Sequence, residues 1–286
     1  MKLTNIFSML GGLALFLYGM NMMSNGLELA AGNKMKTILE KLTSNRILGV
    51  LVGALVTAII QSSSATTVMV VGFVNSGLMS LTSAVWVIMG ANIGTTITGQ
   101  LIAIDITAIA PLIAFIGVAM IVFFKSKKLD AFGSVIGGLG ILFIGMETMS
   151  NAMVPLRTMP EFVGLISKFQ NPFIGILVGA LFTALIQSSS ASVGILQALA
   201  KSGVMTLSSS IYVLFGQNIG TCITSVLASI GTSKNAKRTT IIHLTFNIIG
   251  TVIFVSISML FPFAHLVESI TPNNVAAQIA NVHTIF

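Results

Sequence analysis

Long apolar segments separated by short polar stretches run along the 286-residue chain. An α-helix that rises 1.5 Å per residue needs roughly 20 apolar residues to cross the ~30 Å hydrocarbon core of a bilayer. Six segments approach or exceed this length, so we expect each of them to form a transmembrane helix: 4–24, 84–104, 106–124, 133–154, 210–230 and 239–262.

Two other apolar segments are too short to cross a bilayer. The run from Ile47 to Ile60 has 14 residues, or ~21 Å of helix, and it meets three serines before a second short run, Ala65 to Val74. Two half-length helices joined at a polar tip predict a re-entrant hairpin, here over 46–80 and again over 172–206. Irregular backbone at membrane depth is tolerated only where protein shields it or where it lines a cavity.

The chain contains an internal duplication at a constant offset of 126 residues. "AIIQSSSATT" at 58–67 matches "ALIQSSSASV" at 184–193, and 27 of the 50 positions between 49 and 98 are identical to their counterparts. We therefore divide the chain into repeat 1 (1–126), repeat 2 (127–262) and the start of a further segment (263–286). Repetition at a fixed period is the sequence sign of a duplicated architecture.

The predicted crossings invert the second repeat relative to the first. A hairpin that enters and leaves on one side leaves three crossings per repeat, and an odd number reverses the next copy. This topology puts four basic residues (Lys2, Arg157, Lys168 and Lys201) on one side, and it puts ten on the other: Lys34, Lys36, Lys41, Arg46, Lys125, Lys127, Lys128, Lys234, Lys237 and Arg238. The positive-inside rule makes the second side cytoplasmic and places the N-terminus outside.

Composition agrees with an all-α integral membrane protein. Only 7% of the residues are charged and 55% are hydrophobic, whereas soluble domains carry about 25% charged residues. The net charge of +7 therefore reflects topology and gives no reason to expect nucleic-acid binding. We find no catalytic constellation and no GxxxxGK phosphate loop, so neither an enzyme nor an ATPase is expected.

The serine-rich tips carry the chemistry. A helix N-terminus exposes unpaired N–H groups with partial positive charge and binds anions without a charged side chain. The second arm of each hairpin begins near Ser63–Ala65 or Ser189–Ala191, where serine is a good N-cap. Hydroxyl and amide oxygens also suit small hard cations. Two inverted tips that meet near the midplane would hold an anion and cations together.

A second repeated motif follows each hairpin. "GANIGTTIT" at 90–98 matches "GQNIGTCIT" at 216–224. Glycine permits unwinding or close approach, and Asn and Thr supply oxygens. We therefore expect both spans to be discontinuous helices that face the hairpin tips, as in transporters built from inverted repeats.

These paired hairpins and motifs resemble the type II sodium–phosphate cotransporter family over nearly the whole chain. The resemblance implies sodium-coupled symport of inorganic phosphate in a bacterial plasma membrane, with Na⁺ as coupling ion and no other cofactor. It implies substrate binding by Gln61, Ser62, Ser63, Ser64, Gln187, Ser188, Ser189, Ser190, Asn92 and Asn218. It implies sodium binding by Gln61, Ser64, Thr66, Asn92, Thr95, Gln187, Ser190, Ser192, Asn218 and Thr221.

Alternatives remain open at this point. A sodium-coupled carrier of another oxyanion or of a dicarboxylate, a passive anion channel and a non-transporting sensor are all compatible with the residues. Relatives continue into further spans and a regulatory helical domain, so we expect the chain to be cut within a helix at "NVHTIF". A homo-oligomer is compatible with the sequence.

Five single residues complete the candidates. Glu147 lies in an apolar segment, where acidic residues are functional candidates by default, although it also lies near the end of its span. Asp105 is expected in an interfacial turn, and His243, His283 and Cys222 are expected to pack between helices.

Overall fold

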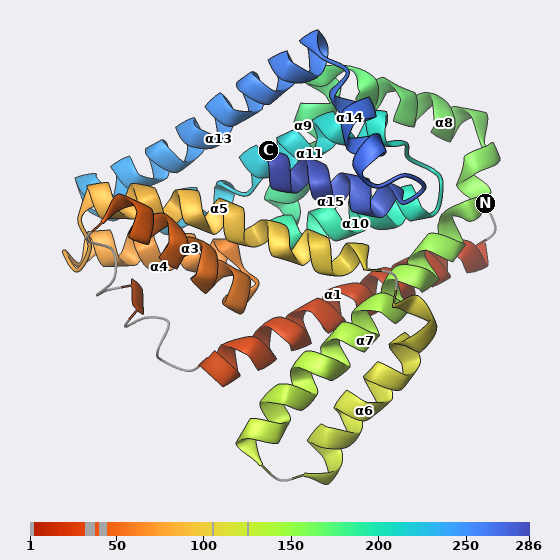
Figure 1. Ribbon diagram of the computed structural model, residues 1–286, viewed down its shortest axis with the longest axis horizontal. Coiled ribbons are helices and arrows are strands. Elements are labelled where there is room, and N and C mark those ends of the chain that lie inside the picture. The colour runs from red at the N-terminus through yellow and green to blue at the C-terminus, as the bar shows by residue number, and fades with distance from the viewer. Residues whose placement is uncertain (1–2, 32–37, 40–44, 105, 125) are drawn as a thin grey trace.

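The computed structural model describes residues 3–31, 38–39, 45–104, 106–124 and 126–286. Every regular element in these ranges is a helix (Figure 1). Repeat 1 contributes α1 (Leu3–Ala31), α3 (Arg46–Ile60), α4 (Ser63–Asn75), α5 (Leu81–Ala103), the 3₁₀ turn η1 (Thr107–Ile109) and α6 (Ala110–Phe123).

Repeat 2 begins with α7 (Lys127–Met153), η2 (Val154–Thr158), α8 (Pro160–Ser167) and η3 (Lys168–Gln170). It continues with α9 (Pro172–Ile186), α10 (Ser189–Lys201), α11 (Leu207–Gly220), α12 (Ile223–Ala228) and α13 (Lys234–Leu260). Two shorter helices follow, α14 (Phe263–Ile270) and α15 (Val275–Ile285).

Five helical segments of the described chain are long and apolar enough to cross a membrane. They are Leu3–Ala31, Leu81–Ala103, Lys127–Thr158, Leu207–Ala228 and Lys234–Leu260, and the bent pair Pro160–Gln170 and Pro172–Ile186 would make a sixth. These five confirm the helices expected over 4–24, 84–104, 133–154, 210–230 and 239–262. The sixth expected span, 106–124, is a shorter apolar helix, Thr107–Phe123, so its expected length is not confirmed.

Each predicted hairpin is a pair of short helices with a break at the expected place. Gln61 directly follows α3 and Gln187 directly follows α9, and both glutamines have left-handed backbone, with φ of 58° and 60°. Each glutamine N–H still bonds the carbonyl four residues earlier, Thr57 O or Thr183 O. A positive φ is uncommon outside glycine, and here it turns the chain sharply so that the next helix begins two residues later.

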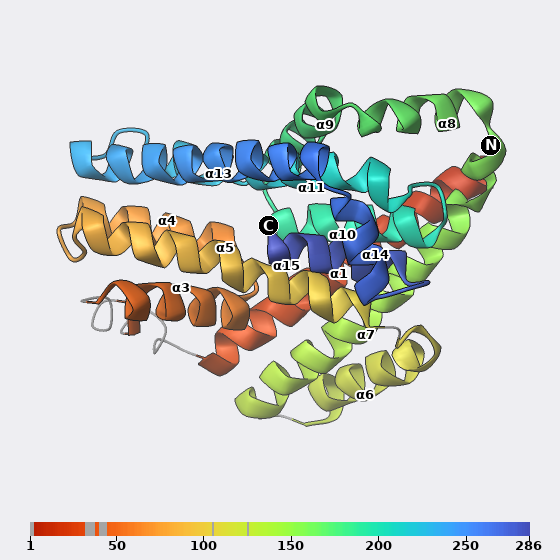
Figure 2. The ribbon, with the colours of Figure 1, turned by 45° about the horizontal axis from the view of Figure 1, so that its top comes forward.

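The helices α1 and α7, which correspond in the two repeats, lie side by side and antiparallel (Figures 1 and 2). Gly12 of α1 approaches the backbone of Gly145 and Met149, and Gly19 approaches Gly138 and Leu142. The numbering falls along α7 as it rises along α1, which fixes the antiparallel direction. Small residues allow this close backbone contact, and such packing is a main source of helix association in membranes.

The prediction that both motif-bearing spans are discontinuous is wrong for α5. α5 runs unbroken through Gly90–Thr98, and its threonines bond back into the helix, Thr95 Oγ1 to Ala91 O (2.9 Å) and Thr96 Oγ1 to Ile93 O (2.8 Å). Its glycines serve close approach instead: a Cβ on Gly90 would lie 2.0 Å from Val50 O of α3.

In repeat 2 the helix does break, between α11 and α12 at Thr221–Cys222. The break leaves the carbonyl of Asn218 without its usual backbone donor, since the N–H of Cys222 bonds Ile219 O instead. Asn247 of α13 supplies the missing donor, with its Nδ2 2.8 Å from Asn218 O. The discontinuity is thus sustained by a polar side chain of a neighbouring span.

The contact between α1 and α7 gives a paired test. Gly12→Ala would place its Cβ 2.5 Å from Met149 N, whereas Gly11→Ala meets no atom within 4 Å. We expect Gly12→Ala to destabilise the protein by ~1–3 kcal/mol and Gly11→Ala to be neutral or slightly stabilising. Thermal unfolding of the purified proteins in detergent measures both, and equal melting temperatures would contradict the packing.

Candidate functional site

The two hairpin tips touch each other. Ser63 and Ser189, which are equivalent in the two repeats, bring their Oγ atoms within 3.4 Å. Ser64 Oγ also donates to the carbonyl of Gln187 across the same contact (3.2 Å). The serines that the sequence analysis selected are therefore brought together from positions more than 120 residues apart.

Thr98 of α5 connects the two tips from the side. Its Oγ1 donates to Gln61 Oε1 (2.8 Å) and accepts from Ser190 Oγ (3.4 Å). Gln61 is buried, whereas its counterpart Gln187 is exposed. All eight tip residues, 61–64 and 187–190, thus lie around one contact, but the two halves are not equivalent.

The tips present two helix N-termini to the same region. Ser62 caps α4 by accepting from Ala65 N (3.1 Å), and Ser188 caps α10 by accepting from Ala191 N (3.2 Å). Each cap satisfies one of the first-turn N–H groups, and the others have no acceptor within their own helix. The partial positive charges of α4 and α10 are therefore directed at the place where the hairpins meet.

A cavity of about 330 Å³ lies beside the tips. Gln61, Ser62 and Ser188 line it together with Asn21 and Ser24 of α1, and its lining contains no charged side chain. Ser24 Oγ also donates to Ile60 O at the end of α3 (2.7 Å). The cavity has room for a small oxyanion with some water, since liquid water takes about 30 Å³ per molecule.

The ligands named in the sequence analysis do not include Asn21, Ser24 or Thr98, although Thr98 belongs to the motif that was expected to face the tips. A signal existed for two of them, because Ser24 recurs as Ser150 and Thr98 recurs as Thr224 at the repeat offset. Nothing in the sequence alone indicated which face of α1 or α5 would meet the tips.

The structure does not bring Asn92 and Asn218 to the tips. Asn92 Nδ2 donates to Asn247 Oδ1 (2.6 Å), and both Asn92 and Asn218 line a separate cavity of about 310 Å³ that His283 also lines. The expectation that both motifs face the tips is therefore wrong for these asparagines. Thr95 and Thr221, from the same motifs, bond back to the carbonyls of Ala91 and Gln217.

One turn behind the tips the two repeats differ in their hydrogen bonding. In repeat 1, Thr57 Oγ1 donates to Thr66 Oγ1 (3.0 Å). In repeat 2 the equivalent atoms, Thr183 Oγ1 and Ser192 Oγ, are buried and have no hydrogen-bond partner among the described residues. Gln217 Oε1 of α11 is unpartnered in the same sense.

The remaining candidates lie apart from the tips or outside the described ranges. Glu147 is exposed, while Asp105 lies outside the described residues. His243 and Cys222 are buried and bonded to Ser225 and Asn247, respectively, which confirms their packing role; His283 is buried as well. No group of three His, Cys, Asp or Glu side chains in the described chain is placed to hold a metal.

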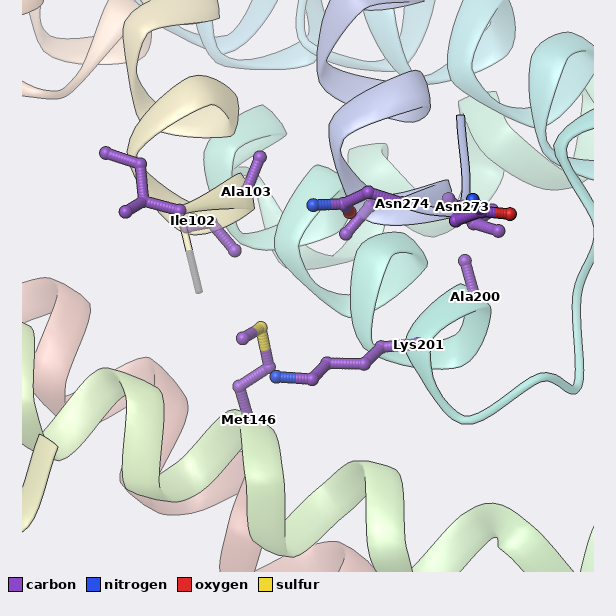
Figure 3. A pocket seen from close by; sticks show the side chains of 10 residues that line it. Ile102, Ala103, Met146, Ala200, Lys201, Asn273 and Asn274 are labelled. Atoms are coloured by element: carbon purple, nitrogen blue, oxygen red, sulfur yellow. The ribbon is translucent and has the colours of Figure 1, made fainter. Parts of the chain in front are cut away.

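A third cavity, of about 270 Å³, lies at the far end of α10 (Figure 3). Lys201, Asn273 and Asn274 are its polar side chains, and Lys201 extends toward Met146 of α7. Lys201 Nζ donates to Thr107 Oγ1 (2.8 Å). None of the tip residues lines this cavity.

Comparison with known proteins gives the family. The model of the Na⁺/Pi-cotransporter family matches residues 15–151 and 158–270, which is most of the chain. The protein therefore belongs to the Na⁺/Pi-cotransporter family, and it is a helical membrane protein of a phosphate-transporting family.

Curated relatives agree with this assignment. "Uncharacterized protein YqeW" of Bacillus subtilis is 32% identical over 95% of this chain and 87% of its own. "Putative inorganic phosphate export protein YjbB" of Salmonella typhimurium is 28% identical over 92% of this chain, which spans 48% of that protein. Rat "Sodium-dependent phosphate transport protein 2A" is 40% identical over 36% of this chain and 16% of its own. No solved structure matches the chain significantly.

Thr98 offers a test of the link between the hairpins. Thr98→Val keeps the shape of the side chain but leaves Gln61 Oε1 and Ser190 Oγ without their shared partner, at a cost of ~1–3 kcal/mol. Thr148→Val is the matched control, because Thr148 Oγ1 bonds only Ile144 O within α7. Thermal unfolding in detergent should show a lower melting temperature for Thr98→Val alone; no difference from the control would argue against the link.

Proposed function

We propose that this protein is a secondary active transporter that moves inorganic phosphate together with Na⁺ by alternating access. The observation that carries the proposal is the meeting of two capped helix N-termini, at Ser63 and Ser189, beside a cavity of suitable size. Membership of the Na⁺/Pi-cotransporter family supports phosphate as the anion and Na⁺ as the coupling ion.

The architecture proposed for this cycle is an inverted repeat of 1–126 and 127–262. The antiparallel contact of α1 with α7 supports it, because equivalent helices of inverted copies must run in opposite directions. In this arrangement the first hairpin opens to the cytoplasm and the second to the outside, with the N-terminus outside a bacterial plasma membrane. Broken helices that meet near the midplane are a recurring transporter plan.

We assign phosphate to the tips. The free N–H groups at the start of α4 and α10 can donate to its oxygens, and so can the hydroxyls of the two serine triplets. Gln61, held by Thr98, and the exposed Gln187 add amide groups on either side. Charge on the anion is then balanced by helix dipoles and by bound sodium, so no buried Lys or Arg is needed.

Sodium is proposed to bind nearby, through oxygens of the tips and of the motifs after them. The assigned residues are Gln61, Ser64, Asn92, Thr95, Gln187, Ser190, Ser192, Asn218 and Thr221. Thr66 leaves the set, because its hydroxyl is bonded to Thr57. Because Asn92 and Asn218 line their own cavity, we favour them as sodium ligands over phosphate ligands.

Export is the second candidate direction. The relatives called YjbB carry phosphate export in their printed name, whereas the mammalian relative is named for sodium-dependent transport. A coupled carrier is reversible, so the ion gradients decide the direction of net flux. A carrier of another oxyanion, a dicarboxylate carrier and a passive channel would differ in anion competition or in the need for Na⁺.

The test is uptake of ³²P-phosphate into proteoliposomes with an inward Na⁺ gradient, compared with choline. We expect uptake to require Na⁺, to be competed by arsenate and to resist succinate. Uptake that is equal in choline would indicate a channel, and competition by succinate alone would indicate a dicarboxylate carrier.

The tip serines are tested in the same assay. Ser63→Ala and Ser189→Ala remove hydroxyls that meet at the tip contact, and each should lower uptake at least tenfold while the protein still inserts. Ser256→Ala is the control, because Ser256 is exposed and bonds only Val252 O within α13. Normal uptake by both tip variants would contradict the assignment of phosphate to the tips.

A further inference from the structure

Five buried side-chain oxygen atoms of repeat 2 have no hydrogen-bond partner among the described residues. Three of them are Thr183 Oγ1, Ser192 Oγ and Gln217 Oε1, whose side chains are 0%, 0% and 2% exposed. A buried polar atom without a partner costs ~1–3 kcal/mol, so three of them near one another require an explanation.

The three side chains come from helices that pack together behind the second tip. Gln217 Nε2 of α11 donates to the backbone carbonyl of Ser192 in α10 (3.1 Å). A Cβ on Gly220, one turn after Gln217, would lie 2.9 Å from Thr183 Cβ of α9. The amide of Gln217 is thus bonded to one arm of the hairpin, and its helix packs one turn further on against Thr183 of the other arm.

Repeat 1 lacks this arrangement at the equivalent positions. Thr57 and Thr66, the counterparts of Thr183 and Ser192, bond each other at 3.0 Å. The counterpart of Gln217 is Ala91, which is fully buried and has no polar side chain. At these positions the hydroxyls of repeat 1 are therefore hydrogen-bonded to each other, whereas the equivalent hydroxyls of repeat 2 have no partner among the described residues.

The chemistry of the three atoms favours a cation. Gln217 uses its Nε2 as a donor, so its free atom is a carbonyl oxygen that can only accept. The two hydroxyls can turn their lone pairs in the same direction. Divalent cations in proteins usually bring carboxylate ligands, and no described Asp or Glu is buried. Neutral oxygens alone suit a monovalent hard cation.

We propose that Thr183, Ser192 and Gln217 form a sodium-binding site in repeat 2 that repeat 1 does not have. The inference rests on the proposed sodium coupling and adds Thr183 and Gln217 to its ligands. It also makes the two hairpins functionally unequal: the second holds sodium behind its tip, and the first closes the same position with a Thr–Thr hydrogen bond.

The test measures thermal stabilisation of the detergent-purified protein by NaCl against choline chloride, without phosphate. The wild type should be stabilised by Na⁺. Thr183→Val should raise the Na⁺ concentration for half-maximal stabilisation about tenfold, as expected for loss of one hydrogen-bonding ligand of a charged group, while its melting temperature in choline is unchanged or higher. Ser192→Ala should show the same increase in the Na⁺ concentration for half-maximal stabilisation.

Thr57→Val is the matched control at the equivalent position. It breaks the bond to Thr66, so its melting temperature should fall in both salts while the Na⁺ concentration for half-maximal stabilisation stays the same. In choline the melting temperature should therefore fall for Thr57→Val and stay the same or rise for Thr183→Val. This difference distinguishes a cation ligand from a hydroxyl with a purely structural hydrogen bond.

Three outcomes would overturn the inference: no stabilisation of the wild type by Na⁺, an unchanged Na⁺ response in both Thr183→Val and Ser192→Ala, or an equal loss in Thr57→Val. An unchanged response would mean that the three atoms bind only a buried water. Sodium-dependent phosphate uptake by the same variants tests the proposed function separately, and that function survives if uptake persists when the response is unchanged.

Discussion

The contact between the two serine tips is the interaction on which the arrangement depends. No single arm of either hairpin is long enough to cross a bilayer, and each hairpin has a tip of irregular backbone that a membrane would not tolerate unshielded. Hydrogen bonds hold the two tips together. Ser63 contacts Ser189, and Ser64 donates to the carbonyl of Gln187. Thr98 bonds both Gln61 and Ser190. The polar atoms are satisfied mutually, and they remain together beside a cavity.

Close backbone packing makes that contact geometrically available. α5 lies on α3 through Gly90 and Gly94, and α11 lies on α9 through Gly216 and Gly220, so each hairpin is fixed to the span that follows it. The glycines of α1 and α7 join the two repeats in the same way. In a bilayer, where apolar association gains little over lipid, this van der Waals contact is a major source of cohesion.

Much of this could be predicted from the sequence, because the duplication made the pattern of spans and hairpins redundant. The hairpin breaks fall at the serines as expected, and the N-caps Ser62 and Ser188 follow from the preference of serine for that position. The left-handed glutamines could not be predicted, since nothing in their residue type requires a positive φ.

The second motif was the harder case. Its glycines permit either unwinding or close packing, and they pack closely against the preceding hairpin arm in both repeats. The helix is nevertheless continuous in repeat 1 and broken in repeat 2, where Asn247 bonds the carbonyl of Asn218. Asn92 and Thr98 are six residues apart, roughly 120° around the helix, so only one of them can face the tips. The sequence alone does not show which of the two side chains faces the tips, because that depends on the tertiary contacts of α5.

The most direct test of the account is the side of the membrane on which each hairpin opens. In a Cys222→Ser background, Ser80→Cys and Thr206→Cys would place single thiols at equivalent exposed positions after the first and second hairpins. A membrane-impermeant maleimide should label Thr206→Cys from the outside in intact cells and Ser80→Cys only in inverted vesicles. Labelling of both thiols from the same side would contradict the inverted arrangement and, with it, the meeting of the tips from opposite faces.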